Sequence, residues 1–205
     1  MTLCPILAQA YPNYIGKGYH ACLTCHYNPF GNGPLNDYGR GVAATALAGR
    51  LFVSKKTSNE KLSERSGFLF NTPKNKFFRP ALDYRGMEFK SGLETDEPVS
   101  RYINMQLDAT GTFLFSKKTI ATITYGVVPS NSTTPTVTKN YKGTEGEDVY
   151  FSREHYVGHR LTPNLGVYLG KMDKVFGIRV PDHFSSSRSR TNNDQYAATH
   201  GAVVH

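Results

Sequence analysis

The sequence predicts a mainly β protein, in which a small loop-and-helix module precedes antiparallel strands of the kind that build a β-barrel. Two observations support this prediction. The chain holds 13 Tyr, 12 Phe and 19 Gly among its 205 residues, a balance that favours strands and turns over helical bundles. From residue 77 onward, apolar and polar residues alternate in runs of about ten, and turn residues separate these runs.

Residues 1–10 are interpreted as the end of a signal peptide. The segment LCPILAQA is short and apolar and finishes on Ala-Gln-Ala, the small-x-small pattern that precedes signal-peptidase cleavage. A full signal has a basic start and a longer apolar core, so we expect its true start upstream of Met1. An ordinary chain terminus is the alternative. Cys4 would leave with the signal, and the mature chain would keep only Cys22 and Cys25.

Residues 11–54 hold the strongest chemical signal, the motif Cys22-x-x-Cys25-His26. Two thiols at this spacing can add to the two vinyl groups of one haem, and the histidine that follows can bind the iron. A zinc site would need a second pair of ligands at zinc spacing. A thioredoxin-like dithiol would need a βαβ setting, and the sequence offers neither. The motif therefore predicts one covalent haem c, with His26 as the iron ligand.

The residues around the motif are typical of a haem pocket. Glycines allow close approach of the backbone, and aromatic side chains can cover the ring; these are Gly31, Gly33 and Gly39, with Tyr19, Tyr27, Phe30 and Tyr38. We expect the carbonyl of Pro34 to accept a hydrogen bond from the second ring nitrogen of His26. We also expect an Ala-rich helix over residues 41–53. The alternative is a plain Gly/Pro/Asn loop. So small a module cannot bury a haem alone, so another part of the chain must cover it.

The sixth ligand of the iron stays open at this stage. Neither Met nor His occurs between His26 and Lys76. Met87 lies in YRGMEFKSG, which weakly resembles the Gly-x-x-Met-x-Phe context of small class I cytochromes c, but a methionine in a strand more often serves packing. A distant histidine and a vacant sixth position are the alternatives.

Residues 55–76 are predicted to be a basic linker. The net charge of the chain is +8, and basic residues gather between Arg50 and Arg79. Such a patch can bind an acidic partner or lipid headgroups, although a solvated linker is the simpler explanation. No helix-turn-helix, zinc-finger or RNA-binding motif accompanies the charge, so nucleic acid is not an expected partner.

Residues 77–205 are predicted to form antiparallel strands. The expected strand regions are 77–89, 100–115, 118–128, a hairpin over 147–173 that turns at residues 162–164, and 195–205. Strict alternation puts Leu107 and Ala109 on one face and Gln106 and Asp108 on the other. Such strands, joined by short turns at one end and long polar loops at the other, fit an outer-membrane β-barrel. A soluble β-sandwich or lipocalin-like barrel alternates as well.

The run YIGKGYHACLTCHYNPFGNGPLNDYGRGVAA resembles the N-terminus of a poorly characterised bacterial family. In that family a single c-type haem module precedes a porin-like outer-membrane β-barrel. The stretch SREHYVGHRLTPNLGVYLGKMDKVFGIRVPDH is similar to the barrel of the family. The resemblance covers about half of the chain. Only about five to seven strands can be counted, whereas closed bacterial barrels use an even number of at least eight, so an incomplete barrel is expected.

The leading hypothesis is a c-type cytochrome with one covalent haem, an electron carrier rather than a catalyst, in the bacterial cell envelope. Its haem module would face the periplasm from the outer membrane, and its partners would be periplasmic redox proteins and outer-membrane lipid. One alternative is a porin-like channel with a structural or regulatory haem. Its basic lumen would use Arg153, His159, Arg160 and Lys171. A haem sensor or enzyme with an open sixth iron position is the other alternative.

Overall fold

Six antiparallel strands form one sheet in the computed structural model, which describes residues 17–19, 21–29, 31–47, 54, 56–67, 75–91, 99–128, 148–163, 165–173 and 198–204. Each strand pairs with the next along the chain, in the order β1 to β6. The strands are β1 (Phe78–Ser91), β2 (Val99–Leu114), β3 (Thr119–Val128), β4 (Val149–Thr162), β5 (Leu165–Met172) and β6 (Thr199–Val204). The mainly β prediction is confirmed. Within the described residues the sheet is open, with β1 and β6 as its edges.

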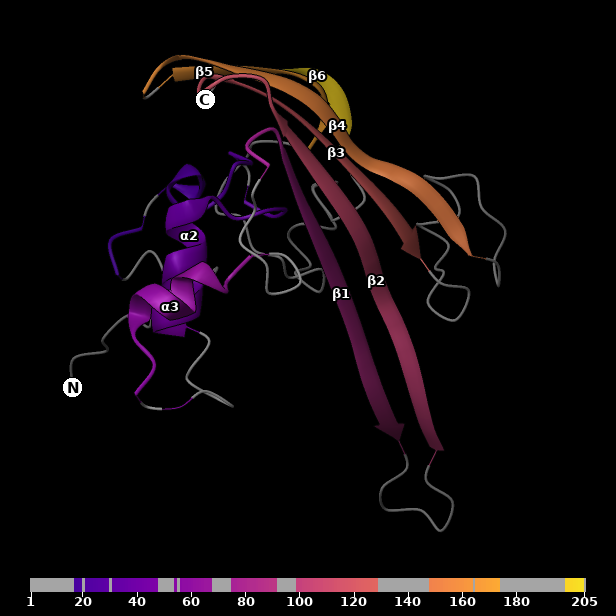
Figure 1. Ribbon diagram of the computed structural model, residues 1–205. Coiled ribbons are helices and arrows are strands. Elements are labelled where there is room, and N and C mark those ends of the chain that lie inside the picture. Colours follow the sequence, from indigo (N-terminus) through magenta and orange to yellow (C-terminus); the bar gives the residue numbers. More distant parts are fainter. Residues whose placement is uncertain are drawn as a thin grey trace, which may run out of the picture.

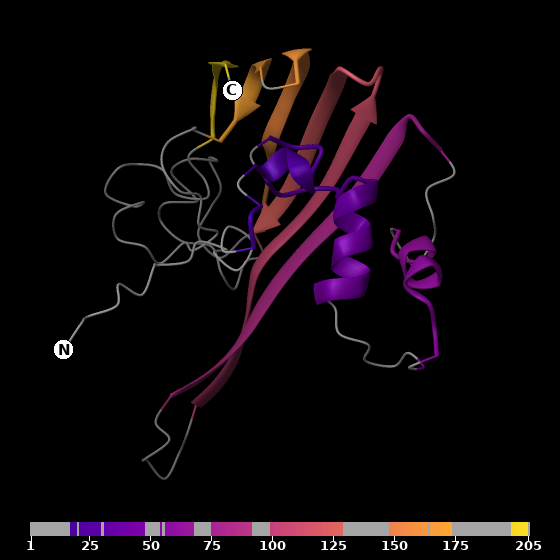
Figure 2. The ribbon, with the colours of Figure 1, turned by 90° about the vertical axis from the view of Figure 1, so that its left-hand side faces the viewer.

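Short helical segments precede the sheet. They are the 3-10 turn η1 (Cys22–Thr24), α2 (Asp37–Val42), the π-helical turn η2 (Ala43–Leu47) and α3 (Asn59–Glu64). In Figure 1 α2 and α3 lie on one side of the sheet, and in Figure 2 they stand at its β1 edge. Among the described residues, none of the helices has the length and apolar character needed to cross a membrane.

Helix α2 begins four residues before the predicted start at Gly41. Asn36 caps it, because its side-chain oxygen accepts a hydrogen bond from the N–H of Gly39 at 2.8 Å, and Asp37 adds a negative charge in the first turn. The prediction followed the Ala-rich run and overlooked this capping signal. Helix α3 lies inside the predicted basic linker and is capped in the same way by Ser58.

In β2 and β3 the two faces of the sheet are opposite in character, whereas in β4 and β5 the buried side chains include the apolar cluster of Tyr156, Tyr168 and Met172. Side chains alternate along β2 and β3 as the sequence predicts, but the polar ones are buried and the apolar ones are exposed. The buried polar residues include Gln106, Asp108, Thr110, Thr112, Thr122, Thr124 and Glu154. The exposed apolar residues include Leu82, Tyr84, Leu107, Ile123, Tyr125, Val157 and Leu169. We refer to these as the polar face and the apolar face. In a soluble antiparallel sheet the apolar face would be the covered one.

A bulge in β4 places an ion pair on the polar face. Thr124 pairs with Glu154, whereas Tyr125 pairs with Ser152, so Arg153 is the extra residue. The bulge buries the Arg153 side chain beside Asp108, with 2.8 Å between Nε and Oδ2. Hydroxyl contacts join β2 to β3 on the same face, at 3.0 Å for Thr110 and Thr124 and 3.2 Å for Thr112 and Thr122.

Candidate haem site

The Cys-x-x-Cys-His motif forms one tight turn. The backbone N–H groups of Cys25 and His26 both donate to the carbonyl of Cys22, at 3.1 and 2.9 Å. Both thiols are free and partly exposed. Because a single turn carries all three side chains, the two sulfurs and the imidazole stay close together, as haem c attachment requires.

Asn36 ties this turn to helix α2. Its side-chain amide donates to the carbonyls of Leu23 and Thr24, at 3.1 and 3.0 Å, and its backbone N–H donates to the carbonyl of Cys25 at 2.9 Å. The same residue caps the helix. Sequence reasoning did not single out Asn36, although an Asn before Asp and a Gly three residues on is a recognisable N-cap pattern.

Gly39 allows α2 to lie directly on the turn. A Cβ at this position would stand 2.2 Å from the carbonyl oxygen of Cys25, so every side chain larger than hydrogen is excluded there. The expectation that this glycine allows close approach to a haem stays a prediction. The partner that it approaches is the backbone of the motif itself.

His26 is held by a left-handed loop. Its Nδ1 lies 3.1 Å from the carbonyl oxygen of Asn32. Gly31, Asn32 and Gly33 all have positive φ, at 73°, 70° and 65°, a conformation that glycine adopts freely and asparagine tolerates better than most residues. When Nδ1 carries the ring proton and donates it to this carbonyl, the lone pair of the imidazole is on Nε2. Burial lowers the pKa of His26 below its ordinary value, while the carbonyls of Asn32 and Gly33 act in the opposite direction. Burial thus favours the neutral imidazole, the form that binds a metal ion.

The expected hydrogen bond from His26 to Pro34 is replaced. The carbonyl of Pro34 instead accepts the backbone N–H of Tyr27 at 3.3 Å. The reason is the left-handed loop, which turns the Asn32 carbonyl toward the ring before the chain returns to pair Leu35 with His26. Pro34 is buried. Its assignment to the haem site stays a prediction.

The Cys25 thiol does not resemble the reactive cysteine of a redox dithiol. Burial, and secondarily the neighbouring Cys22, raise the pKa of Cys25 above its ordinary value. Redox dithiols of the thioredoxin type have a lowered pKa instead, because the thiolate is the nucleophile. The environment of Cys25 therefore favours a thiol that reacts once, when it is joined to haem, over one that is repeatedly oxidised and reduced.

The loop of the site lies on the polar face of the sheet. The buried side chain of Asn28 donates from Nδ2 to Oε2 of Glu154 in β4 at 3.2 Å. A Cβ on Gly33 would stand 3.1 Å from Cγ2 of Thr110 in β2. The residues that follow the motif are thus covered by strands far along the chain. That these strands also cover a haem, as expected from the sequence, stays a prediction.

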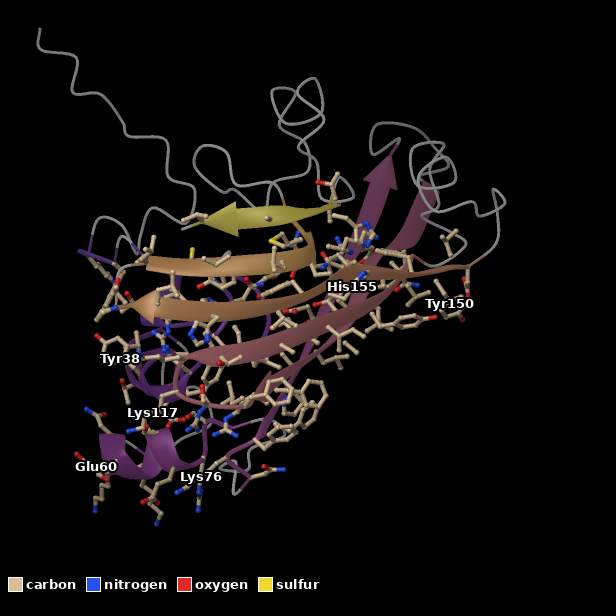
Figure 3. The ribbon with its side chains drawn as sticks, turned by 90° about the horizontal axis from the view of Figure 1, so that it is seen from above. Tyr38, Glu60, Lys76, Lys117, Tyr150 and His155 are labelled. Carbon is tan, nitrogen blue, oxygen red and sulfur yellow. The ribbon has the colours of Figure 1, made fainter. Side chains whose placement is uncertain are left out.

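The remaining expected haem-pocket residues are only partly described. The hydroxyl groups of Tyr19 and Tyr38 are 2.9 Å apart, and Tyr38, labelled in Figure 3, is half exposed. Phe30 lies outside the described residues. The backbone of Met87 pairs with Ile103 inside β1 and β2, and its side chain is not among those described. The sixth ligand therefore stays open.

Among the side chains that the structure describes, no group of three or more His, Cys, Asp or Glu residues is arranged to hold a metal ion. Comparison of the chain with protein-family models, with curated proteins and with solved structures found no match.

Proposed function

We propose that this chain is a c-type cytochrome, which binds one haem through Cys22 and Cys25 with His26 as an axial ligand, and which carries electrons in the bacterial cell envelope. The observation that supports this most is the position of His26. Its ring is anchored through Nδ1 on the Asn32 carbonyl, within one turn of both thiols. The donor set fits haem c, and the bound group would supply one-electron chemistry.

The surrounding residues of the chain would hold and tune this centre. The Asn32 carbonyl would fix the ring orientation of His26 and raise the basicity of the nitrogen that binds the iron. Asn36 and Gly39 hold the motif on α2. The bond between Asn28 and Glu154 fixes the loop on the polar face of the sheet. Each of these contacts reduces the freedom of the site, and a rigid site changes little in structure when its charge changes by one electron.

We further propose that the strands belong to an outer-membrane β-barrel. The support is the inverted character of β2 and β3, because a membrane barrel has a polar interior and an apolar exterior. Phe77, Phe113 and Phe115 cluster at the short-turn end, where the ring centroids of Phe113 and Phe115 lie 5.6 and 5.4 Å from that of Phe77. From Phe78 to Tyr84 the apolar face of β1 spans about 20 Å, near the apolar height of such barrels. The six strands among the described residues are fewer than the smallest closed barrel uses, so they would form part of one.

This topology would put the haem module on the periplasmic side. Short turns join β2 to β3 and β4 to β5, at the end of the sheet where β1 begins. Outer-membrane barrels place their short turns in the periplasm. The module precedes β1 and would therefore enter from that side, where periplasmic redox proteins can reach it.

The haem proposal is tested by a pyridine haemochrome spectrum of protein produced with intact haem c maturation machinery. We expect an absorbing haem that survives extraction with acidic acetone, and its loss in the Cys22→Ala, Cys25→Ala double variant. A colourless wild-type protein, or haem that is fully extracted, would contradict the proposal.

The membrane proposal is tested by the substitution Leu82→Lys on the apolar face. If lipid covers this face, a lysine there costs about 2–4 kcal/mol, and the yield of protein in the outer-membrane fraction should fall sharply. On a water-exposed sheet the same change would be nearly neutral, because Leu82 is already 57% exposed. Pro163→Lys, at an exposed position in the turn between β4 and β5, is the control and should leave the yield unchanged.

The channel hypothesis retains one supporting observation, the polar face. Of its proposed basic lining, His159 and Lys171 alternate with the buried Gly158 and Met172 and so belong to the apolar face, which does not favour a place for them in a lumen. Arg153 is on the polar face but is paired with Asp108. Planar-bilayer conductance would support a channel, and silent bilayers would remove it. For the sensor hypothesis, carbon monoxide binding to the reduced protein is the corresponding test.

A further inference from the structure

Two histidines from strands that are not neighbours meet on the apolar face, away from the candidate haem site. Nε2 of His155 in β4 lies 3.1 Å from Nε2 of His200 in β6, and the ring centroids are 5.1 Å apart. The register places Lys171 of β5 between them, because His155 pairs with Lys171 and Lys171 with His200. The imidazoles therefore reach toward each other across a strand.

The bulge in β4 creates this arrangement. Residues three apart in a regular strand point to opposite faces, but the extra residue Arg153 puts Ser152 and His155 on the same face. Nδ1 of His155 then lies 2.8 Å from Oγ of Ser152. A hydroxyl that accepts from Nδ1–H leaves the Nε2 lone pair free and fixes the ring, as outer partners of metal-binding histidines do.

We propose that His155 and His200 bind a divalent transition-metal ion of the kind that prefers imidazole, such as Cu²⁺, Ni²⁺ or Zn²⁺. With metal–nitrogen bonds of about 2.0–2.1 Å, the separation of 3.1 Å between the Nε2 atoms gives an angle of about 100° at the metal. This angle lies between those of square-planar and tetrahedral centres, so both nitrogens can bind one ion without moving apart.

The histidine pair is open to the surface at His200. His200 is exposed and is the second residue of β6, and Lys171 is the second-last residue of β5. The pair thus lies where β5 ends and β6 begins, beside the longer connections, which in the proposed barrel is the rim of the lipid-facing band and not its middle. Figure 3 shows His155 on β4, the strand that also carries Tyr150. Water or an external ligand would complete the coordination.

Lys171 places a second positive charge beside the proposed metal ion and repels it. Its ammonium group is drawn aside, because Nζ donates to the carbonyl of Ser152 at 2.6 Å, but it remains a cation beside a cation site. We therefore expect Lys171→Met to bind the metal more tightly than the wild type. Ser152→Ala removes the partner of Nδ1 and should weaken binding by about 10-fold or more.

Copper titration of the haem-loaded protein, purified without a histidine tag, tests the proposal. Electron paramagnetic resonance should show one bound Cu²⁺ per chain with nitrogen couplings, and His155→Gln and His200→Gln should each weaken binding at least about 10-fold. His159→Gln is the matched control. It changes a histidine on the same strand that contacts Thr119 instead, and it should bind as the wild type does.

The result that would overturn the proposal is equally direct. If the wild type binds no Cu²⁺ with nitrogen couplings, or if His200→Gln binds it as well as the wild type does, the pair is not a metal site. Because His200 is exposed, its replacement leaves folding intact, and an unchanged circular dichroism spectrum verifies this. The haem signal is measured in the same samples, so failure of this site is distinguishable from failure of the haem proposal.

Discussion

Replacing Gly39 with Ala should separate helix α2 from the Cys-x-x-Cys-His turn. The added Cβ would lie 2.2 Å from the carbonyl oxygen of Cys25, whereas ordinary contact begins at 3.4 Å. The helix must therefore retreat by about 1 Å. The obstacle is backbone, so no side-chain rotation relieves the overlap.

The cost follows from the contacts that the retreat breaks. Asn36 makes three hydrogen bonds to the turn, to the carbonyls of Leu23, Thr24 and Cys25. At about 1 kcal/mol each, their loss costs about 3 kcal/mol, and the residual overlap adds about 1–3 kcal/mol. A module of this size has little stability in reserve, so most chains should fail to present the motif for haem attachment.

The assay is covalent haem per chain, from the haemochrome absorbance divided by the protein concentration. Gly41→Ala is the matched control, because a Cβ there would meet only Oγ of Ser63 at 3.3 Å, and alanine in a helix is favoured over glycine by about 1 kcal/mol. We expect Gly39→Ala to lose most of its haem and Gly41→Ala to keep it. Equal haem content in the two variants would refute the packing described for the site.

Three further predictions concern the sheet and its junction with the module. Asp108→Asn removes the carboxylate that is paired with the buried Arg153 and should destabilise the protein by about 3–5 kcal/mol in a denaturant titration; replacing both residues with Leu should recover most of this, and no recovery would contradict a buried pair. Asn28→Ala leaves the Glu154 carboxylate without this donor and should cost about 1–3 kcal/mol, seen as faster tryptic release of the module; an unchanged rate would count against the junction. Because the pKa of His26 is lowered chiefly by burial, the haem-free module is expected to be most stable above the ordinary histidine pKa and to lose stability as the pH falls toward the lowered value; proteolysis at pH 5 that is no faster than at pH 7.5 would exclude a buried neutral imidazole.

The strands were predictable because their signal is local. Alternation in residues such as Gln106, Leu107 and Asp108 specifies two faces whatever the rest of the chain does. The turn at residues 162–164 is likewise marked by its own sequence, and the structure ends β4 at Thr162 and begins β5 at Leu165. What alternation cannot specify is which face is covered, because burial depends on what packs against the sheet.

The contacts of the site were harder to predict because they depend on backbone geometry. Pro34 was chosen as the partner of His26 from its distance along the chain. Three consecutive left-handed residues centred on Asn32 turn a different carbonyl toward the ring, and single-residue preferences do not reveal such a run in advance. The bond between Asn28 and Glu154 joins residues 126 positions apart, so no local pattern could indicate it.

The bulge at Arg153 was also hard to predict from the sequence. Regular alternation would put Ser152 and His155 on opposite faces, and a single extra residue in β4 brings them together. Its sequence signal is weak, because Ser-Arg-Glu-His is polar throughout and gives no apolar residue from which to read the register. Both the ion pair with Asp108 and the histidine pair depend on this one irregularity.

Mass spectrometry of the tryptic peptide from Gly18 to Arg40 tests the central claim most directly. Trypsin cleaves after Lys17 and Arg40, and no other Lys or Arg lies between them, so one peptide contains the whole motif. For protein produced with haem c maturation machinery, we predict this peptide with the added mass of one haem, bound to both Cys22 and Cys25. The peptide without that mass, with two thiols that react with iodoacetamide, would contradict the account.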